Sequence, residues 1–125
     1  LGYMNADLKV KIADAVTLIE MTIALHPDTP AYLDSLGWAL FRQDRLTEAE
    51  DYLRRAVVKE TGSAVVMDHL GDVLGRQGKM AEALEYWNRA LQGEDEDGEL
   101  DRTRVAEKIR DAQARLGQAV PVPQP

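Results

Sequence analysis

The sequence predicts an all-α fold, an α-solenoid of antiparallel helical hairpins closed by a C-terminal capping helix. The first indication is an internal repeat: when residues 30–62 are paired with residues 64–96, 12 of the 33 pairs are identical, whereas ordinary residue frequencies give about two. The second is helical spacing, because the apolar residues of each unit recur at steps of three and four. Short polar breaks are the third, and they divide every 34-residue unit into two helices.

Composition limits the class of protein. A chain of 125 residues that is 45% apolar and 30% charged has the size of one folded domain or a short repeat array. No apolar stretch approaches the ~18 residues of a transmembrane helix, and no signal peptide opens the sequence, so we expect a soluble segment without membrane insertion. The lack of cysteine excludes disulfides and cysteine-ligated metals.

The acidic charge is unevenly distributed. The net charge is 15 − 22 = −7, and residues 94–101 alone hold six acids and no base, so the other 117 residues carry about −1. Binding to a phosphate backbone requires clustered Lys and Arg, and the chain has no basic stripe. Nucleic acid is therefore not an expected partner.

Residues 1–28 look like a partial N-terminal copy of the repeat. Residues 1–3 align with residues 36–38 at a spacing of 35, while Ala15 and Ile19 lie 34 residues before their counterparts in the next unit. One residue inserted in the turn between two helices accounts for the difference. Because the chain starts inside the first of these helices, we expect it to be the C-terminal end of a longer array.

Residues 29–62 and 63–96 are two full repeats of two helices each. The first helix of each repeat begins at a capping residue. Thr29 precedes Pro30, which suits the first helical position, and Ser63 occupies the matching place one repeat later. These residues predict the N-terminal boundaries of both repeats.

The second helix of each repeat follows a short turn. Gly78 predicts the end of the helix before that turn, and Thr47 with Glu50 matches a capping box at the start of the helix after it in the first full repeat. The sequence therefore predicts short connections within the hairpins.

Small residues mark the places where helices meet. Gly37 and Gly71 recur at one position of the repeat, and we expect two helices to approach closely there, while Leu53 and Trp87 fill the space between hairpins. Since a lone hairpin cannot bury its apolar face, each repeat needs neighbours and the last one needs a cap.

Residues 97–117 predict an acidic loop and the capping helix. Charged residues, Lys108 among them, lie largely on one face of that helix. The opposite, apolar face is made of Leu100, Val105, Ala106, Ile109, Ala112 and Leu116. Residues 118–125 are proline-rich and lack a helical pattern, so we expect an extended, flexible tail.

This pattern resembles the tetratricopeptide repeat (TPR) family. A 34-residue unit with Leu-Gly in its first helix and Ala at two fixed places in its second is typical of that family, and residues 1 to about 96 carry it. The strings at residues 32–38 and 68–72 are similar to the C-terminal repeats of long bacterial TPR proteins. The resemblance implies a right-handed superhelix whose concave groove, lined by first helices, holds a partner peptide or protein segment. It implies no catalysis and no cofactor.

Helix geometry indicates which residues line that groove. If Leu33, Leu36 and Leu40 face the core, the residues on the opposite side of the first helices face the groove. The groove residues predicted in this way are Tyr3, Asp34, Trp38, Phe41, Arg42, Asp68, Asp72 and Arg76.

The groove residues suggest the chemistry of a partner. We expect the aromatic side chains to bind apolar groups, the aspartates to attract Lys or Arg, and the arginines to contact carbonyl groups or a carboxylate. A protein or peptide with basic and apolar residues fits this surface. The alternative is that Trp38 and Phe41 only pack against the neighbouring hairpin.

A structural module for self-association is the alternative function. If upstream repeats are missing, an apolar surface stays open to form a homo-oligomer; it consists of Ile12, Val16, Ile19 and Ile23. An enzyme has little support, because Ser35 and His69 lie on adjacent hairpins about 10 Å apart, too far for a nucleophile and its base. The acidic run does not fit a calcium loop, and no metal site is expected.

Overall fold

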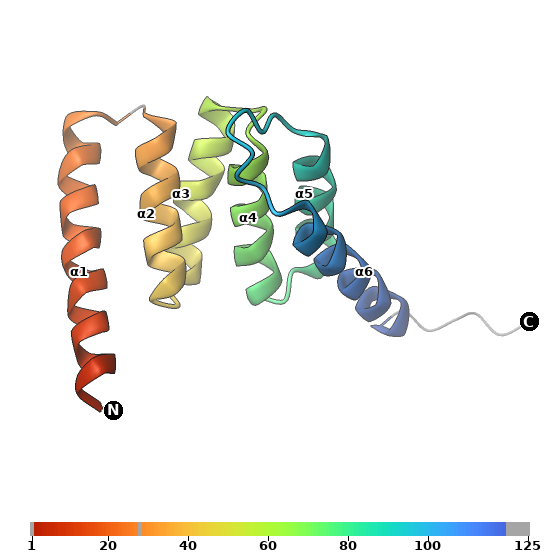
Figure 1. Cartoon of the computed structure of the whole chain (residues 1–125), viewed down its shortest axis with the longest axis horizontal. Coiled ribbons are helices and arrows are strands. Elements are labelled where there is room, and N and C mark those ends of the chain that lie inside the picture. Colours follow the sequence, from red (N-terminus) through yellow and green to blue (C-terminus); the bar gives the residue numbers. More distant parts are fainter. Residues whose placement is uncertain (1, 28, 120–125) are drawn as a thin grey trace, which may run out of the picture. The chain divides into compact units, whose positions relative to one another are not determined.

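Within residues 2–27 and 29–119, which the computed structural model describes, the chain forms six helices and no extended strand (Figure 1). Side chains are described for residues 11, 13–27 and 29–117. The chain divides between Thr61 and Gly62 into two compact units. None of the described helices has the length and apolar character needed to cross a membrane. The predicted all-α fold is confirmed.

The first unit contains α1 (Gly2–Leu25), α2 (Pro30–Arg42) and α3 (Leu46–Lys59). Helices α2 and α3 form the antiparallel hairpin of the first full repeat, and α1 packs against α2 (Figure 1). Thr29 is the N-cap of α2 and Pro30 its first residue, as the sequence predicts. The pyrrolidine ring suits this position because the backbone N–H that it lacks has no partner in the first turn.

The second unit contains α4 (Ala64–Arg76), α5 (Met80–Gln92) and α6 (Arg102–Ala119). The Ser63 hydroxyl accepts a hydrogen bond from the Val66 amide at 3.4 Å, which confirms the predicted N-cap of α4. Gly78 adopts φ 82° directly after α4, so the predicted helix stop is also confirmed. Glycine carries no Cβ, and this left-handed conformation therefore costs it little.

Helix α6 caps the second unit by packing on α5. Val105 is fully buried, and Leu100, Ile109 and Ala112 are buried beside it. Arg102 Nη1 donates a hydrogen bond to the Leu91 carbonyl at 2.8 Å, which ties the start of α6 to the end of α5. The predicted capping helix is confirmed.

The N-terminal region differs from the expected partial hairpin, because α1 runs unbroken through residues 2–25. In the full repeats the turn uses a residue at positive φ, Asp44 at 62° and Gly78 at 82°. The corresponding residues 8–12 contain only Leu, Lys, Val and Ile, side chains that avoid this conformation. The chain there continues as a helix.

The apolar surface that was expected to be open on residues 12–23 is packed instead. Val16 and Ile23 are buried on the side of α1 that meets α2, and Ile19 is half-buried. The side chain of Ile12 lies outside the described residues. The exposed apolar residues of α1 are Leu18, Met21 and Leu25. Because α1 is apolar on two sides, helical spacing alone did not indicate which side meets α2.

The predicted capping box at Thr47 and Glu50 is wrong. Helix α3 begins at Leu46 with Arg45 at the N-cap position, so Thr47 already lies within its first turn. The turn at Asp44 brings the Arg45 amide to the Leu40 carbonyl at 3.0 Å and starts the helix earlier than the side-chain pattern suggests. Glu50 instead pairs with Arg54 one turn later, at 2.8 Å.

The two repeat glycines are places of close helix packing, as predicted. A Cβ atom on Gly37 would lie 2.6 Å from Leu53 Cγ, and one on Gly71 would lie 2.5 Å from Trp87 Cδ1. Leu53 and Trp87 therefore fill space within their own hairpins, whereas the sequence predicted space between hairpins. The glycines allow a large side chain of the second helix to rest on the backbone of the first.

Candidate functional site

The side of α2 opposite its core residues carries the predicted aromatic groove residues. Leu33, Leu36 and Leu40 are each 1% exposed and form the core side. Trp38 and Phe41 are half-buried on the other side, and their rings stack with centroids 4.9 Å apart and an interplanar angle of 30°. Two large side chains thus form one apolar feature on the surface of the first unit.

Two charged residues flank the Trp38–Phe41 stack on the same helix. Asp34 lies one turn before Trp38 and is half-buried, and Arg42 lies one turn after it and is exposed. The four side chains place an acid, two aromatic rings and a base along one side of α2. This arrangement is suited to an extended or helical segment that carries apolar and charged groups.

The corresponding side of α4 holds a lysine of the chain's own capping helix. Lys108 Nζ donates to Asp68 Oδ1 at 2.7 Å and to Asp72 Oδ1 at 2.6 Å. The three side chains keep only 14%, 18% and 20% of their exposure, in that order. The two aspartates therefore bind a lysine of the chain's own α6, whereas the sequence predicted a lysine or arginine of a partner.

Trp87 of α5 completes this cluster. Its indole Nε1 donates to Asp72 Oδ1 at 3.1 Å, and Lys108 Nζ lies 5.4 Å from the centre of its ring. The ammonium group thus interacts with two carboxylates and one aromatic face. We call Asp68, Asp72, Trp87 and Lys108 the α6 anchor.

Burial changes the acidity of one member of the α6 anchor. Loss of solvent raises the pKa of the Asp68 carboxyl, the hydrogen bond from Lys108 opposes the rise, and repulsion from Asp72 adds to it. Burial is the largest single cause, and the net result is a raised pKa of the Asp68 carboxyl.

Sequence reasoning missed the role of Lys108, which it placed with the polar face of α6. A signal was present, because Lys108 follows Val105 by three residues and precedes Ala112 by four, and both of these are buried. This spacing places Lys108 at the edge of the apolar face. The identity of its partners depended on how α6 packs.

The remaining groove residues are placed only in part. Arg76 is exposed near the end of α4, and the side chain of Tyr3 lies outside the described residues. A groove that runs from Tyr3 over Trp38 to Asp72 involves both units and stays a prediction. Among the described side chains, no group of three His, Asp or Glu residues is arranged to hold a metal ion.

Sequence comparison assigns the class of protein that these hairpins represent. Profiles of the tetratricopeptide repeat match residues 11–64 and residues 63–93. The chain belongs to the tetratricopeptide repeat family. It is also 47% identical over 57 residues to a TPR repeat-containing protein of Pseudomonas aeruginosa. The match covers 46% of this chain but only 10% of that relative.

Solved TPR structures share the fold at low sequence identity. The type III secretion translocator chaperone SycD of Yersinia enterocolitica has a TM-score of 0.80 at 17% identity, over 91% of this chain and 80% of that one. The same chaperone in complex with a peptide of the translocator YopD has a TM-score of 0.78 at 17% identity, over 90% and 88%. The first TPR of Spaghetti, bound to an HSP90 peptide, has a TM-score of 0.76 at 17% identity, over 90% and 86%.

Proposed function

We propose that this chain is a protein–protein interaction module that binds a segment of a partner protein on the first helices of its repeats. Membership of the TPR family supports this class of function. Two of the similar structures are described as holding peptides, one from HSP90 and one from YopD. The proposal includes no chemical step and needs neither a cofactor nor a metal ion.

The Trp38–Phe41 stack is the observation that carries the proposal. Aromatic side chains dominate the energetics of protein interfaces because they bury a large area at a small entropic cost. Here two rings lie together, half-buried, on the side of α2 away from the core. We assign them the apolar contact with the partner.

The charged neighbours define the rest of the partner's chemistry. Asp34 lies where it can receive a Lys or Arg of the bound segment, and Arg42 where it can contact a carbonyl group or a carboxylate. A segment with apolar and basic residues therefore fits α2 best. Arg76 on α4 remains a predicted contact of the partner, as does Tyr3, whose side chain lies outside the described residues.

The contacts of the α6 anchor change the role that we assign to Asp68 and Asp72. Both carboxylates are engaged by Lys108, so a basic residue of the partner reaches them only if Lys108 leaves. We therefore assign these two aspartates to the docking of α6 and limit the partner's contacts on the second unit to Arg76. Asp34 becomes the acidic residue that selects the partner.

A pull-down with two matched variants tests the proposal. The 125-residue chain serves as bait in source-cell lysate, beside Trp38→Ala and, as a control, Tyr32→Ala, which truncates an exposed aromatic on another side of α2. We expect a partner that binds the unmodified chain and Tyr32→Ala about tenfold or more tightly than Trp38→Ala when the affinities are measured by calorimetry. Equal retention by all three baits at equal helicity contradicts the assignment to α2.

Self-association is a second candidate function, and α1 favours it. Leu18, Met21 and Leu25 are 64%, 61% and 78% exposed at steps of three and four. Such an apolar stripe is typical of a helix that packs against another helix.

A further inference from the structure

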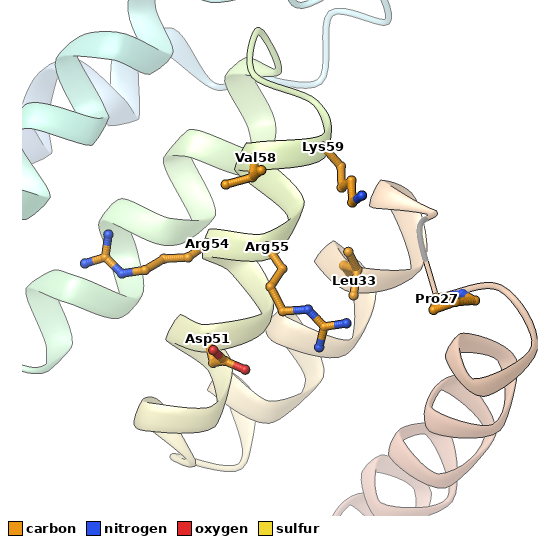
Figure 2. A pocket seen from close by; sticks show the side chains of 7 residues that line it. All are labelled: Pro27, Leu33, Asp51, Arg54, Arg55, Val58 and Lys59. Carbon is orange, nitrogen blue, oxygen red and sulfur yellow. The ribbon is translucent and has the colours of Figure 1, made fainter.

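A pocket of about 260 Å³ lies in the first unit, between the end of α1 and the outer side of α3 (Figure 2). Its volume is just below the ~300–1,000 Å³ of pockets that hold drug-sized ligands, so it suits one or two peptide side chains. Trp38 and Phe41 do not line it, and Leu33, which does, belongs to the core side of α2. The pocket is therefore distinct from the α2 surface of the proposed function.

The floor and one edge of the pocket are apolar. Buried Leu33 lies at the bottom, Pro27 lies on the α1 side, and Val58 of α3 is 72% exposed at the edge. Exposure of the aliphatic Val58 side chain at the edge of a hollow indicates a place for an apolar side chain of a ligand.

The rim of the pocket is basic although the chain carries a net charge of −7. Three cationic residues and one acid, Asp51, line it. Arg54 points away from Pro27 in Figure 2 and pairs with Glu50 at 2.8 Å. Arg55 extends toward Leu33, and Lys59 lies one turn further on the same side of α3. Two cations thus lie beside the apolar floor.

The second full repeat lacks this combination. At the positions of Arg54 and Val58, helix α5 has Asn88 and Gln92, and at the position of Lys59 the chain has Gly93, directly after α5. The Arg55 position is shared: Arg55 lies 5.1 Å from the centre of the Tyr52 ring, and Arg89 lies 4.8 Å from that of Tyr86. The α4–α5 hairpin therefore forms without the basic and apolar residues that line this pocket, so packing of the repeat does not require them.

We propose that this pocket binds an acidic segment of a partner protein, with an apolar side chain on Leu33 and Val58 and carboxylates at Arg55 and Lys59. Charge complementarity selects the partner, because two cations beside an apolar floor favour carboxylates next to an aliphatic group. This partner differs from the basic and apolar segment assigned to α2, so the chain has two binding surfaces of opposite charge preference.

An NMR titration of the ¹⁵N-labelled chain tests the pocket. The probe is an acetylated and amidated pentapeptide, Gly-Glu-Leu-Glu-Gly, compared with the same peptide carrying Gln or Lys in place of both Glu, and with Ala in place of Leu. We expect shifts of the Arg55, Val58 and Lys59 amides and a dissociation constant on the order of 1 mM. The three comparison peptides should bind at least about fivefold more weakly.

Two matched variants locate the binding. Arg55→Glu should weaken binding of the acidic peptide about fivefold or more. Arg89→Glu should leave binding unchanged, although it removes the same charge and the same stacking on a tyrosine, in α5. Val58→Gln introduces the residue that α5 has at this position, so it tests the apolar edge in a chain that folds. Both pocket variants are first checked for unchanged helicity.

Several results would overturn the inference. One is the absence of amide chemical-shift changes at peptide concentrations about tenfold above the expected dissociation constant. Another is equal binding of the acidic and basic peptides. The third is an equal loss of affinity for the acidic peptide in Arg55→Glu and Arg89→Glu. A dimer that sedimentation detects and Arg55→Glu dissolves would assign the pocket to the acidic loop of a second copy instead of a partner. None of these results tests the role of Trp38, so the proposal for α2 and the proposal for this pocket can be rejected independently.

Discussion

Gly71 is the residue whose side-chain size the fold restricts most. The edge of the Trp87 ring occupies the space next to the Gly71 backbone. A Cβ atom on Gly71 would lie 2.5 Å from Trp87 Cδ1 and 2.5 Å from Nε1. The indole ring cannot move aside easily, because Nε1 also donates to Asp72 at 3.1 Å. The packing of α4 on α5 therefore depends on the absence of a side chain.

We expect Gly71→Ala to lower the free energy of unfolding by about 1–3 kcal/mol, since the added methyl group forces the helices or the ring to shift. Urea denaturation followed by far-UV circular dichroism measures this change. Gly117→Ala is the control: nothing lies within 4 Å of a Cβ there, and alanine should stabilise α6 by up to about 1 kcal/mol. Equal stability of Gly71→Ala and the unmodified chain would contradict the packing described.

Asp68 predicts a pH dependence with a definite sign. Burial raises the pKa of its carboxyl above the ordinary value of 3.8, so the folded chain holds this proton to higher pH than the unfolded chain does. The contribution of Asp68 to the free energy of unfolding is therefore present at low pH and is lost as the pH rises through the folded-state pKa.

Comparison with Asp68→Asn isolates this contribution from those of the other acids. As the pH rises from 3.8, the ordinary pKa of an aspartate, toward neutrality, we expect the unmodified chain to lose stability relative to Asp68→Asn. Urea denaturation of both proteins across that range measures the difference. A gain in relative stability with rising pH would mean that the attraction of Lys108 outweighs burial.

At the scale of the element, α6 is held to the second unit in two ways. Its apolar face packs on α5 through Val105, Ile109 and Ala112. Its polar edge reaches α4 through Lys108, whose ammonium bonds both aspartates of the α6 anchor. The helix therefore joins both members of the α4–α5 hairpin.

We expect Lys108→Ala to lower the free energy of unfolding by about 1–3 kcal/mol, because it leaves two neighbouring carboxylates partly buried without their cation. The value is below that for a fully buried pair, since the side chains keep 14–20% of their exposure. Arg104→Ala is the control on the same helix: its pair with Glu107 spans 3.3 Å with side chains 61% and 50% exposed, and should contribute under about 1 kcal/mol. Equal effects of the two variants in urea denaturation would argue against the α6 anchor.

Helix α1 has a second apolar side, which α2 does not cover. One of its sides is buried on α2 through Val16 and Ile23. The stripe of Leu18, Met21 and Leu25 occupies the repeat positions that α3 fills with Tyr52, Arg55 and Lys59. Where α3 carries polar side chains on its outer face, α1 carries aliphatic ones.

We expect the chain to self-associate through this stripe, and Leu18→Glu with Met21→Glu to shift it to the monomer, because burying these side chains drives helix packing and a carboxylate opposes it. Sedimentation equilibrium over a range of concentrations measures the assembly. Val58→Glu, which changes another exposed aliphatic residue of the same unit, should have no effect. A chain that stays monomeric at every concentration would remove self-association as a function.

The repeat and most of its boundaries could be predicted from local sequence patterns. The 34-residue period, the cap at Ser63, the stop at Gly78 and the close approach at Gly71 were all predicted, and the structure confirms them. These features are predictable from the sequence because they follow from local properties: the helical period, the backbone conformations that each residue tolerates, and the size of its side chain. The same rules placed Trp38 and Phe41 opposite the core.

Which surfaces of the helices meet depends on tertiary packing, and local sequence patterns did not predict it. Lys108 binds Asp68 and Asp72, which lie 40 and 36 residues before it in the sequence. The residues around Lys108 do not indicate these partners. The side of α1 that packs on α2 was also undetermined, because apolar residues lie on two sides of that helix. The pocket of the first unit likewise required Pro27, which follows α1, to lie close to α3. Helical spacing fixes the face of a residue on its own helix, whereas its contacts depend on how helices distant in sequence dock.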